Sequence, residues 1–462
     1  MSTISDIKQS ISSSTAVQVV KDAIAKAESV AEYNALLSLT AERALDRAAK
    51  VDAGEITGDL AGVPFVVKDN FLAFGAPTTA ASKMLESFNA PLQATAVERL
   101  EAAGAICIGK ANLDAFAHGG STENSAFGPT KNAADQTRVA GGSSGGSAVV
   151  TALDVVPFAL GTDTGGSIRQ PASFNGVVGV KPTYGTVSRY GVVAMASSTD
   201  TIGVFTHNAA DAEQVMSIMS GKDERDMTTL DDFFAPQTQP VESRKIGLIK
   251  EFMTDDVDPE VRQSIMQYVE RLRSAGHDVE EVSLSMLQYA IAMYYIIVPA
   301  EISSNLARYD GIRYGYRSSD VQTLAELYGK SRDEGFVAEN KRRIMIGSYV
   351  LSSGFFDAYY QQAQKARTLL IDEFNKMFDQ YDALIGPVSP TPAFKLGENT
   401  SDPVKMYLAD VMTVSPSLAG LPAISVPAGT TATGLPVGVQ LIGARKSDAQ
   451  LLALAKSLEG AN

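Results

Sequence analysis

Apolar residues in the first 54 positions recur at helical spacing. Val17, Val20 and Ile24 follow one another at intervals of three and four residues, and a similar pattern returns at residues 44–51. Side chains with this period lie on one face of an α-helix. The pattern predicts two or three helices, packed outside the core, before Gly54.

Short apolar runs alternate with a helical pattern in the next part of the chain. Residues 63–67 and 105–108 are apolar runs typical of buried strands, and residues 95–103 between them have helical spacing. Strands that alternate with helices indicate parallel pairing, with helices on both faces of the sheet. We expect an α/β fold with a mixed, largely parallel β-sheet and some antiparallel strands.

The second half of the chain is richer in helical patterns. Residues 221–240, rich in Asp, Thr and Pro, predict an exposed loop. A strand, a helix and another strand are predicted at residues 245–249, 259–275 and 279–282. Four helical patterns follow, at residues 284–307, 319–328, 333–351 and 355–378. The chain ends with three predicted strands and a helix, at residues 383–385, 423–426, 437–442 and 447–458.

These patterns indicate one discontinuous domain over residues 1–462, because the last strands are expected to rejoin the first sheet. Its expected parts are N-terminal helices (1–60), a catalytic core (61–220), a helical insertion over a cleft (285–380) and a return to the sheet (381–462).

Composition excludes several classes of function. The 462 residues carry a net charge of −14, which argues against direct binding of a nucleic-acid backbone by clustered Lys and Arg. The single cysteine, Cys107, cannot form an internal disulfide, and we expect it to be a small buried residue. No Cys/His cluster suggests a metal site.

The N-terminal segment is polar, and no apolar run is expected to be long enough to span a membrane. We therefore expect a cytoplasmic protein.

Two glycine- and serine-rich segments carry the candidate chemistry. Residues 141–147 (GGSSGGS) and 161–167 (GTDTGGS) flank the apolar run 148–160. Glycines at this density permit positive φ angles and close approach of the backbone, and successive N–H groups in such turns form an anion-binding cup. A hydroxyl at the rim, from Ser143 or Ser167, is placed like a nucleophile beside an oxyanion hole.

A flexible linker, a nucleotide-binding loop and an aspartic-protease motif all fit these two segments less well. A linker is not usually followed at once by a buried apolar run. The segments lack the Gly-Lys-Ser/Thr ending of a phosphate loop and the Gly-x-Gly-x-x-Gly of a dinucleotide fold. Residues 163–165 resemble an aspartic-protease triplet, but a second triplet is absent.

A serine nucleophile needs a base, and Lys68 is the strongest candidate. His207 and His277 are expected in surface turns, while His118 stays possible. Lys68 ends the apolar run 63–67, so burial would lower its pKa and make neutral amine available. The alternative is a lysine that extends from a strand end into solvent.

Three motifs in order and spacing resemble the amidase signature family: GVPFVVKD (62–69), GGSSGGSA (141–148) and GTDTGGSIR (161–169). The resemblance implies a Ser-Ser-Lys triad on one α/β domain. Ser167 would be the nucleophile, Ser143 a bridging serine held by a cis peptide, and Lys68 the base.

The second glycine-rich segment would also supply the oxyanion hole. We expect the backbone N–H groups of Thr164, Gly165, Gly166 and Ser167 to bind the negative oxygen that develops during attack on an amide.

Further stretches resemble one branch of the family, the glutaminase subunits of tRNA-dependent amidotransferases, and the resemblance covers about residues 4–458. These stretches are residues 188–198, 307–315, 341–347, 351–360, 407–410 and 418–427.

This branch implies residues that select glutamine. Arg343 would bind the α-carboxylate, Asp410 the α-ammonium group, and Tyr294 would be a further contact. Arg342 and Tyr295 are the nearest rivals. All of these could instead serve helix-surface packing or salt bridges.

The segment 112–132 resembles a loop near the substrate, with departures. The branch usually has Glu at the place of Ala115 and Met at the place of His118. His118 would either approach the substrate or fill the space of the methionine.

The same resemblance implies partners. The chain would form a heterotrimer with amidotransferase subunits B and C and deliver ammonia from glutamine to a subunit that amidates Glu-tRNA(Gln), Asp-tRNA(Asn) or both. ATP, Mg²⁺ and tRNA would bind to that partner, so we expect no cofactor in this chain.

Two alternatives remain. A stand-alone amidase that acts on another amide or an allophanate-like compound would share the triad without needing Arg343 and Asp410 for glutamine. A scaffold subunit with a dead site would not require the intact Lys68, Ser143 and Ser167.

Overall fold

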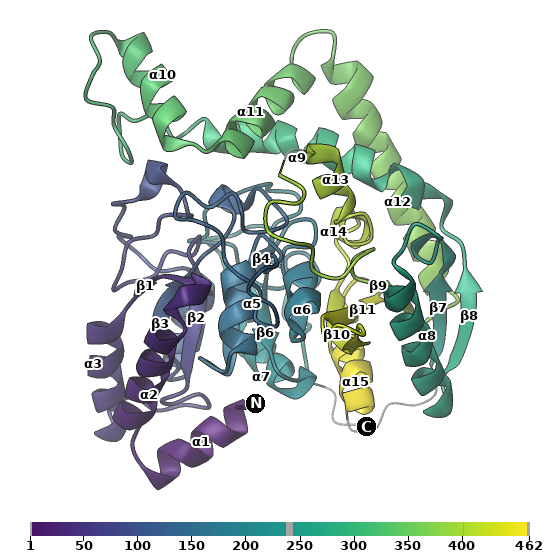
Figure 1. Ribbon diagram of the computed structural model, residues 1–462, viewed down its shortest axis with the longest axis horizontal. Helices are drawn as coiled ribbons and strands as arrows, with labels where there is room; N and C mark the ends of the chain where they lie inside the picture. The colour runs from purple at the N-terminus through teal and green to yellow at the C-terminus, as the bar shows by residue number, and fades with distance from the viewer. Residues whose placement is uncertain (1, 237–243, 401, 460–462) are drawn as a thin grey trace.

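The computed structural model describes residues 2–236, 244–400 and 402–459 (Figure 1). In this part of the chain, eleven strands form one sheet in the order β1-β3-β2-β4-β6-β5-β10-β11-β9-β7-β8. The strands are β1 (Leu36–Leu39), β2 (Pro64–Lys68), β3 (Ile106–Ala111), β4 (Phe158–Asp163), β5 (Val178–Lys181), β6 (Thr201–Thr206), β7 (Lys245–Ile249), β8 (Asp278–Val282), β9 (Ala383–Pro387), β10 (Ala423–Thr430) and β11 (Pro436–Gly443).

The sheet is mixed, as predicted, but has more antiparallel pairing than expected. Parallel pairs are confined to β3-β2-β4 and β8-β7-β9. The remaining neighbours are antiparallel. The reason is that β5 and β6, like β10 and β11, follow one another without an intervening helix, and a parallel pair needs a long crossover.

Helices cover both faces of the sheet. Alternate residues of β2 show the two faces: Phe65 and Val67 join a core that includes residues of α4, α7 and α15, whereas Val66 packs with residues of α2, α3 and α5. The helices are α1 (Ile4–Ser13), α2 (Ala16–Ser29), α3 (Ala41–Asp52), α4 (Thr95–Ala102), α5 (Gly145–Ala152), α6 (Arg169–Asn175), α7 (Ala209–Met219), α8 (Pro259–Ser274), α9 (Ala290–Leu306), α10 (Leu324–Gly335), α11 (Ala338–Val350), α12 (Gln362–Phe378), α13 (Pro403–Leu408), α14 (Val414–Leu418) and α15 (Asp448–Glu459).

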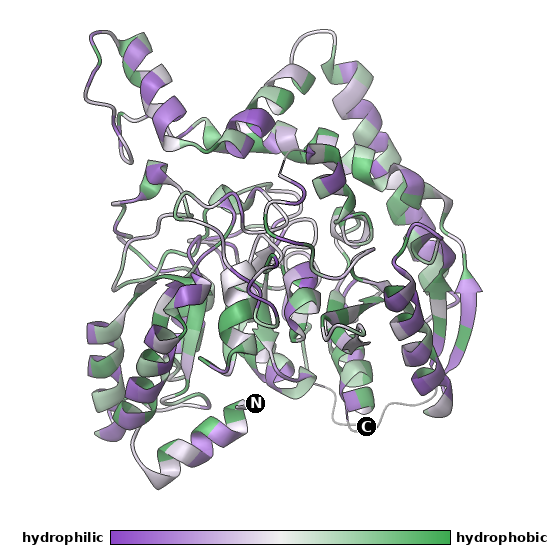
Figure 2. Ribbon diagram, viewed as in Figure 1, coloured by the Kyte–Doolittle hydropathy of each residue, from purple (hydrophilic) through white to green (hydrophobic). Residues whose placement is uncertain are grey.

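Hydropathy follows this layering. Figure 2 shows helices that carry both hydrophobic and hydrophilic residues, and an edge strand, β8, that is largely hydrophilic. The helix ends have their own signals, such as Asn208, whose side chain accepts a hydrogen bond from the Asp211 N–H at the start of α7. At the start of α8, Asp258 caps the helix and Pro259 occupies its first turn.

The helical segment predicted at residues 285–380 forms a layer above the sheet (Figure 1). In it, α9 packs against α11 and α12. After this layer, β9 pairs with β11 and β7, and β10 pairs with β5. We infer from this continuous sheet that the chain forms one discontinuous domain.

The sequence predicted no apolar run long enough to span a membrane, but one helical stretch meets that criterion. Ser285–Leu306, 22 residues long with a mean hydropathy of 1.2, has the length and composition to cross a membrane, and it is the single such stretch among the described residues. Half of it is buried inside the structure. Packing of α9 against α11, α12 and α14 accounts for its apolar character.

Most predicted elements occur within a few residues of their expected positions. Several elements were not predicted, among them strands β5 and β6, helix α7 and the edge strand β1, which has four half-buried residues. The helix expected at 319–328 begins at Leu324, after the capping residue Thr323. The pattern at 333–351 spans two helices that separate at Phe336. Residues 237–240 of the predicted loop lie outside the described residues.

Cys107 is fully buried, as predicted. Two lysines on the same pair of strands are also fully buried: Lys68 at the end of β2 and Lys110 on β3. Val67 pairs with Lys110 and Lys68 with Ala111, so the two lysine side chains leave opposite faces of the sheet.

The two lysines have different surroundings. Lys110 Nζ forms a buried ion pair with Asp69 Oδ1 at 3.2 Å and donates to the Phe71 carbonyl at 2.6 Å and to Thr78 Oγ1 at 2.8 Å. This lysine therefore stabilises the loop that follows β2.

We predict that Lys110→Met lowers the free energy of unfolding by about 3–5 kcal/mol, because Asp69 would remain buried without its counter-charge. Chemical denaturation measures the change. The control is Lys50→Met, which removes an exposed pair with Asp46 and should cost less than about 1 kcal/mol. Equal losses in the two variants would contradict the prediction.

Candidate active site

Lys68 lies at the centre of a cluster of hydroxyl groups. Its Nζ donates to Ser143 Oγ at 2.8 Å, to Ser144 Oγ at 2.8 Å and to Thr162 Oγ1 at 2.9 Å. The side chain is fully buried. The amine thus has neutral hydroxyl partners and no directly bonded carboxylate among the described residues, in contrast to Lys110.

Burial lowers the pKa of Lys68 to about 7, although the charges of Asp114, Asp163 and Asp200 oppose this shift. About half of the molecules therefore hold a neutral amine at neutral pH. A neutral amine can accept a proton, which is the property required of a base.

The fold brings the two glycine-rich segments to this lysine. β2 and β4 are parallel neighbours, so Lys68 and the segment after β4 lie at the same edge of the sheet. The first segment leads into α5, and the Gly142–Ser143 peptide is cis. At Gly146 a Cβ atom would lie 2.3 Å from the Ala35 carbonyl oxygen, so only glycine fits there.

Ser167 lies in the turn between β4 and α6 and is 8% exposed. The Ser144 N–H donates to the Ser167 carbonyl at 3.1 Å, which holds the two segments together. No hydrogen bond joins the hydroxyls of Ser143 and Ser167 among the described residues. Of the two contacts in the predicted relay, the structure therefore contains the one between Lys68 and Ser143.

The backbone of the second segment departs from the prediction at one position. The Gly166 N–H donates to Asp163 Oδ1 at 2.8 Å, so it is not free to bind an oxyanion. Within the described chain, the N–H groups of Thr164, Gly165 and Ser167 donate to no backbone or side-chain acceptor. These three are the donors that remain for an oxyanion.

Sequence reasoning missed several residues around this segment. Ser144 and Thr162 accept hydrogen bonds from Lys68, as Ser143 does. Their only signal in the sequence was their place within the two glycine-rich motifs. Asp163 and Arg169 form a fully buried ion pair of 2.9 Å. Burial would raise the pKa of Asp163, but the Arg169 charge and its hydrogen bonds lower that pKa to about 2.

Arg343 on α11 is buried and faces aromatic rings. Its Nε donates to Glu339 Oε1 at 2.8 Å. Its two Nη groups form no hydrogen bond within the described part of the chain, so they remain available for an anion. The guanidinium carbon lies 5.4 Å from the ring centre of Tyr295 and 5.7 Å from that of Tyr407. Arg343 also borders a small cavity of about 80 Å³.

The two rival residues have different positions. The Arg342 side chain is 44% exposed and pairs with Glu339. Tyr295 is half-buried and stacks on Tyr407, with ring centres 3.9 Å apart. Tyr294 is buried, and a Cβ atom at Gly165 would lie 2.6 Å from its hydroxyl oxygen. Tyr294 is thus the tyrosine that touches the glycine-rich segment.

Asp410 follows α13 and is half-buried. A Cβ atom at Gly120 would lie 3.4 Å from its Oδ2, so the carboxyl group faces the 118–121 loop. Its enclosed position raises the pKa of Asp410 to about 8, although the charge of Arg343 lowers it. A cation bound beside this group would favour its charged form.

The structure corrects the prediction for two histidines. His207 and His277, expected in exposed turns, are both largely enclosed: the His207 side chain is 3% exposed and pairs with Asp154, and His277 is buried. His118 is fully buried, with Nδ1 2.8 Å from Asn340 Nδ2. Burial, assisted by the Arg343 charge, holds the pKa of His118 well below its usual value.

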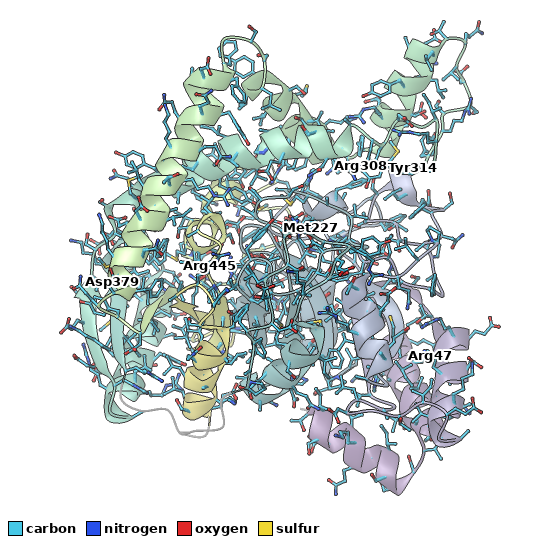
Figure 3. All side chains as sticks on the ribbon, turned by 180° about the vertical axis from the view of Figure 1, so that it is seen from behind. Arg47, Met227, Arg308, Tyr314, Asp379 and Arg445 are labelled. Atoms are coloured by element: carbon cyan, nitrogen blue, oxygen red, sulfur yellow. The ribbon has the colours of Figure 1, made fainter. Side chains whose placement is uncertain are left out.

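A cavity of about 270 Å³ adjoins the hydroxyl cluster and is lined by Thr162, Asp200 and Arg308, among others. Arg308 also lines a groove of about 400 Å³ that Tyr314 borders. The side chains of Arg308 and Tyr314, labelled in Figure 3, lie where the helical layer meets the core. The surroundings of Lys68 therefore adjoin space for several water molecules.

No group of three or more His, Cys, Asp or Glu side chains in the described parts of the chain is placed to hold a metal ion. The polar groups around Lys68 are hydroxyls, which suit proton transfer better than metal binding.

Relatives of known name resemble nearly the whole chain. It is 51% identical to the A subunit of glutamyl-tRNA(Gln) amidotransferase from Lacticaseibacillus casei (strain BL23) over 455 residues, which cover 97% of this chain and 94% of the relative. It is 50% identical to the protein of the same name from Koribacter versatilis (strain Ellin345), over 93% of this chain and 91% of the relative.

A solved structure agrees with these relatives. The crystal structure of the A subunit of glutamyl-tRNA(Gln) amidotransferase from Thermotoga maritima superimposes with a TM-score of 0.79 at 41% identity, covering 95% of this chain and 91% of that one. Residues 18–452 match the family described as Amidase. On its sequence, its mixed sheet and its relatives, this chain belongs to the amidase family.

Proposed function

We propose that this chain is the glutaminase subunit of a tRNA-dependent amidotransferase. It would hydrolyse glutamine and deliver ammonia to a partner that converts Glu-tRNA(Gln) to Gln-tRNA(Gln), Asp-tRNA(Asn) to Asn-tRNA(Asn), or both. The observation that carries the proposal is the buried Lys68, with a pKa of about 7, hydrogen-bonded to Ser143. The relatives named above, which match over nearly their full length, support it.

In the proposed reaction, Lys68 accepts a proton from Ser143 while Ser143 accepts the proton of Ser167. The Ser167 Oγ then attacks the carboxamide carbon, and the carbonyl electrons move to the oxygen. The free N–H groups of Thr164, Gly165 and Ser167 would bind this oxyanion, and the loss of one such donor typically costs about 3–4 kcal/mol.

The intermediate collapses when the carbon–nitrogen bond breaks and the relay returns a proton to the leaving nitrogen. Ammonia departs, and a glutamyl ester remains on Ser167. A water molecule, deprotonated through the same relay, hydrolyses the ester to glutamate and restores the serine. The step from Ser143 to Ser167 requires their hydroxyls to come within hydrogen-bond distance, and such contacts commonly tighten when substrate binds.

Selection of glutamine would depend on the charges of its α-carboxylate and α-ammonium groups. The free Nη groups of Arg343 form a planar pair of donors that suits an α-carboxylate. Asp410 would bind the α-ammonium group, which would lower its raised pKa. An amide that lacks these charges would leave the Arg343 Nη groups and the Asp410 carboxyl group without a ligand partner, at a cost in affinity.

Partners would supply the rest of the reaction. We propose a heterotrimer with subunits B and C in the cytoplasm, in which the amidating subunit binds ATP, Mg²⁺ and tRNA. The net charge of −14 supports indirect contact with tRNA. Enclosed delivery of ammonia would prevent its protonation and loss in water.

We predict that Ser167→Ala lowers the rate of ammonia release from glutamine by at least about 10³-fold, because the nucleophile is lost. A coupled ammonia assay on the full chain with its partner subunits measures this. The control is Ser147→Ala, which removes a buried hydroxyl that donates to the Leu160 carbonyl and should keep most of the activity. Undiminished turnover by Ser167→Ala would refute the assignment.

The lowered pKa of Lys68 predicts a pH profile. Lys68 must be neutral to act as a base, so kcat should be full above about pH 8, half-maximal near pH 7 and about tenfold lower for each pH unit below 6. Stopped assays from about pH 5 to 9 test this, with thermal unfolding at each pH as the control for stability. A rate that stays constant down to the acid end of this range would exclude Lys68 as the base.

Arg343 and Arg342 offer a matched comparison, since both pair with Glu339. We predict that Arg343→Ala raises the KM for glutamine more than about tenfold, because the α-carboxylate loses a two-pronged partner. Arg342→Ala, on the exposed side, should change KM less than twofold. Similar KM values in both variants would remove Arg343 from the substrate site.

A further inference from the structure

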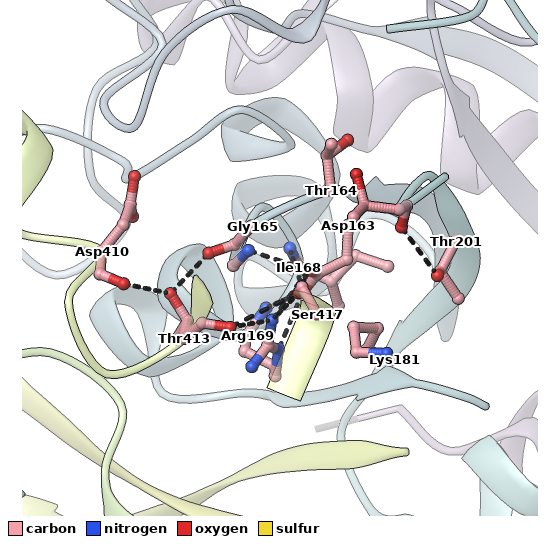
Figure 4. A network of polar contacts seen from close by, with 12 residues as sticks. Asp163, Thr164, Gly165, Ile168, Arg169, Lys181, Thr201, Asp410, Thr413 and Ser417 are labelled. Atoms are coloured by element: carbon pink, nitrogen blue, oxygen red, sulfur yellow. Dashed lines mark hydrogen bonds and ion pairs between the residues drawn. The ribbon is translucent and has the colours of Figure 1, made fainter. Parts of the chain in front are cut away.

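The second glycine-rich segment is held in place by Thr413, which lies 248 positions from Gly165 in the part of the chain that carries Asp410. Thr413 is fully buried. Its Oγ1 donates to the Gly165 carbonyl at 2.7 Å, and its own carbonyl accepts from Arg169 Nη2 at 2.9 Å (Figure 4). Thr413 therefore contacts both ends of the turn that contains Ser167.

These contacts fix one peptide unit from both sides. The Gly165 carbonyl is bound by Thr413, and the N–H of the same unit, on Gly166, is bound by Asp163 at 2.8 Å. In a trans peptide the two groups point in opposite directions, so neither can turn without breaking a bond. The orientation of this unit constrains the neighbouring units, which carry the free N–H groups of Gly165 and Ser167.

The fit between Thr413 and the turn is close. Gly166 has φ +138°, and a Cβ atom there would lie 2.2 Å from Thr413 Oγ1. Glycine is therefore required at this position both by its backbone conformation and by the neighbouring hydroxyl. Gly165 packs against the Tyr294 ring, so Tyr294 and Thr413 both confine the turn.

Thr413 also contacts the backbone of Asp410. The Thr413 N–H donates to the Asp410 carbonyl at 3.0 Å, and Thr413 Oγ1 lies 3.1 Å from the same carbonyl oxygen. A hydroxyl has one hydrogen, so the carbonyls of Gly165 and Asp410 compete for it, and the shorter distance favours Gly165. Thr413 thus links the nucleophile turn, through its hydroxyl (Figure 4), to the backbone of Asp410, through its N–H group.

We propose that Thr413 is a positioning residue for amide hydrolysis: its hydroxyl orients the Gly165–Gly166 peptide so that the N–H groups of Gly165 and Ser167 face the oxyanion, and its backbone N–H couples this turn to Asp410. The inference rests on the proposed function, because it assigns the segment 164–167 to the oxyanion and Asp410 to the substrate. Thr413 itself would touch no reacting atom.

Kinetics of Thr413→Val and Thr413→Ser test the proposal. Valine keeps the shape but removes the donor, and serine keeps the donor. We expect Thr413→Val to lower kcat for glutamine by about 10- to 100-fold, with KM changed less than threefold, and Thr413→Ser to stay within about threefold of the unaltered chain. All variants are assayed as full chains with their partner subunits.

A matched control separates positioning from general loss of stability. Thr186 is also buried, and its hydroxyl donates to the Thr183 carbonyl at 2.7 Å. Thr186→Val should lower the Tm about as much as Thr413→Val but leave kcat within twofold. Equal kcat losses in the two variants, or a kcat of Thr413→Val within twofold of the unaltered chain, would overturn the proposal.

Binding of two ligands gives a second readout. A glutamate analogue with a boronic acid in place of the side-chain carboxyl accepts the Ser167 oxygen on boron, while the serine proton passes to Lys68, and the product is an anionic tetrahedral boronate. Thr413→Val should weaken this binding at least about tenfold and change glutamate binding less than twofold. Equal weakening of both ligands would indicate a merely structural role.

The outcomes also distinguish the inference from the proposed function. An unaltered chain that releases no ammonia from glutamine in its complex refutes the proposed function. An active unaltered chain with an equally active Thr413→Val variant refutes only the role of Thr413.

Discussion

A primary amine buried without a directly bonded carboxylate is the constraint on which this site depends. Water would keep Lys68 protonated, and a carboxylate in direct contact with it, such as the one that Asp69 places beside the neighbouring Lys110, would favour the protonated form of Lys68 as well. Three hydroxyls satisfy the amine at the end of β2 instead. The two buried lysines therefore differ: Lys110 stabilises a loop, whereas the pKa of Lys68 lies near neutral pH.

The second constraint is that the backbone itself must supply charge stabilisation. Free N–H groups in a folded interior are costly unless they face a ligand or water. Among the residues that the structure describes, those of Thr164, Gly165 and Ser167 in the turn 163–169 have no acceptor, while Asp163 binds that of Gly166. The buried ion pair of Asp163 and Arg169 holds the rest of the turn. Rigidity of this kind avoids reorganisation as the negative charge develops.

The sequence was sufficient for features that depend on local patterns. Lys68, Ser143 and Ser167 lie within short motifs, and the structure brings Lys68 and Ser143 into contact. Strand β1 was missed because four half-buried residues carry little periodicity. His207 was misplaced because its burial depends on packing against residues far away in the chain, including Asp154. Contacts of this kind follow from the tertiary structure and leave no pattern in the nearby residues.

From the sequence, the Gly166 N–H was expected to bind the oxyanion, but in the structure it donates to Asp163. The reason for this difference is related. A glycine-rich segment indicates that N–H groups point inward, but it does not indicate which of them an adjacent carboxylate already binds. The direction of each peptide unit is decided by partners such as Asp163 and, from the other half of the chain, Thr413. The sequence thus identifies where an oxyanion site is built, whereas its individual donors follow only from the packed structure.

The arrangement of the chain divides the chemistry between two parts. Strands β2 and β4 and the two glycine-rich segments, all within residues 61–181, hold the groups that would break the amide bond. The residues that would select the substrate come from α9, α11 and the segment after α13. Since Tyr294 and Thr413 both confine the nucleophile turn, the later segments complete the geometry of the earlier ones. The proposed substrate recognition and reactivity would therefore be physically connected at Gly165 and Gly166, where the two parts meet.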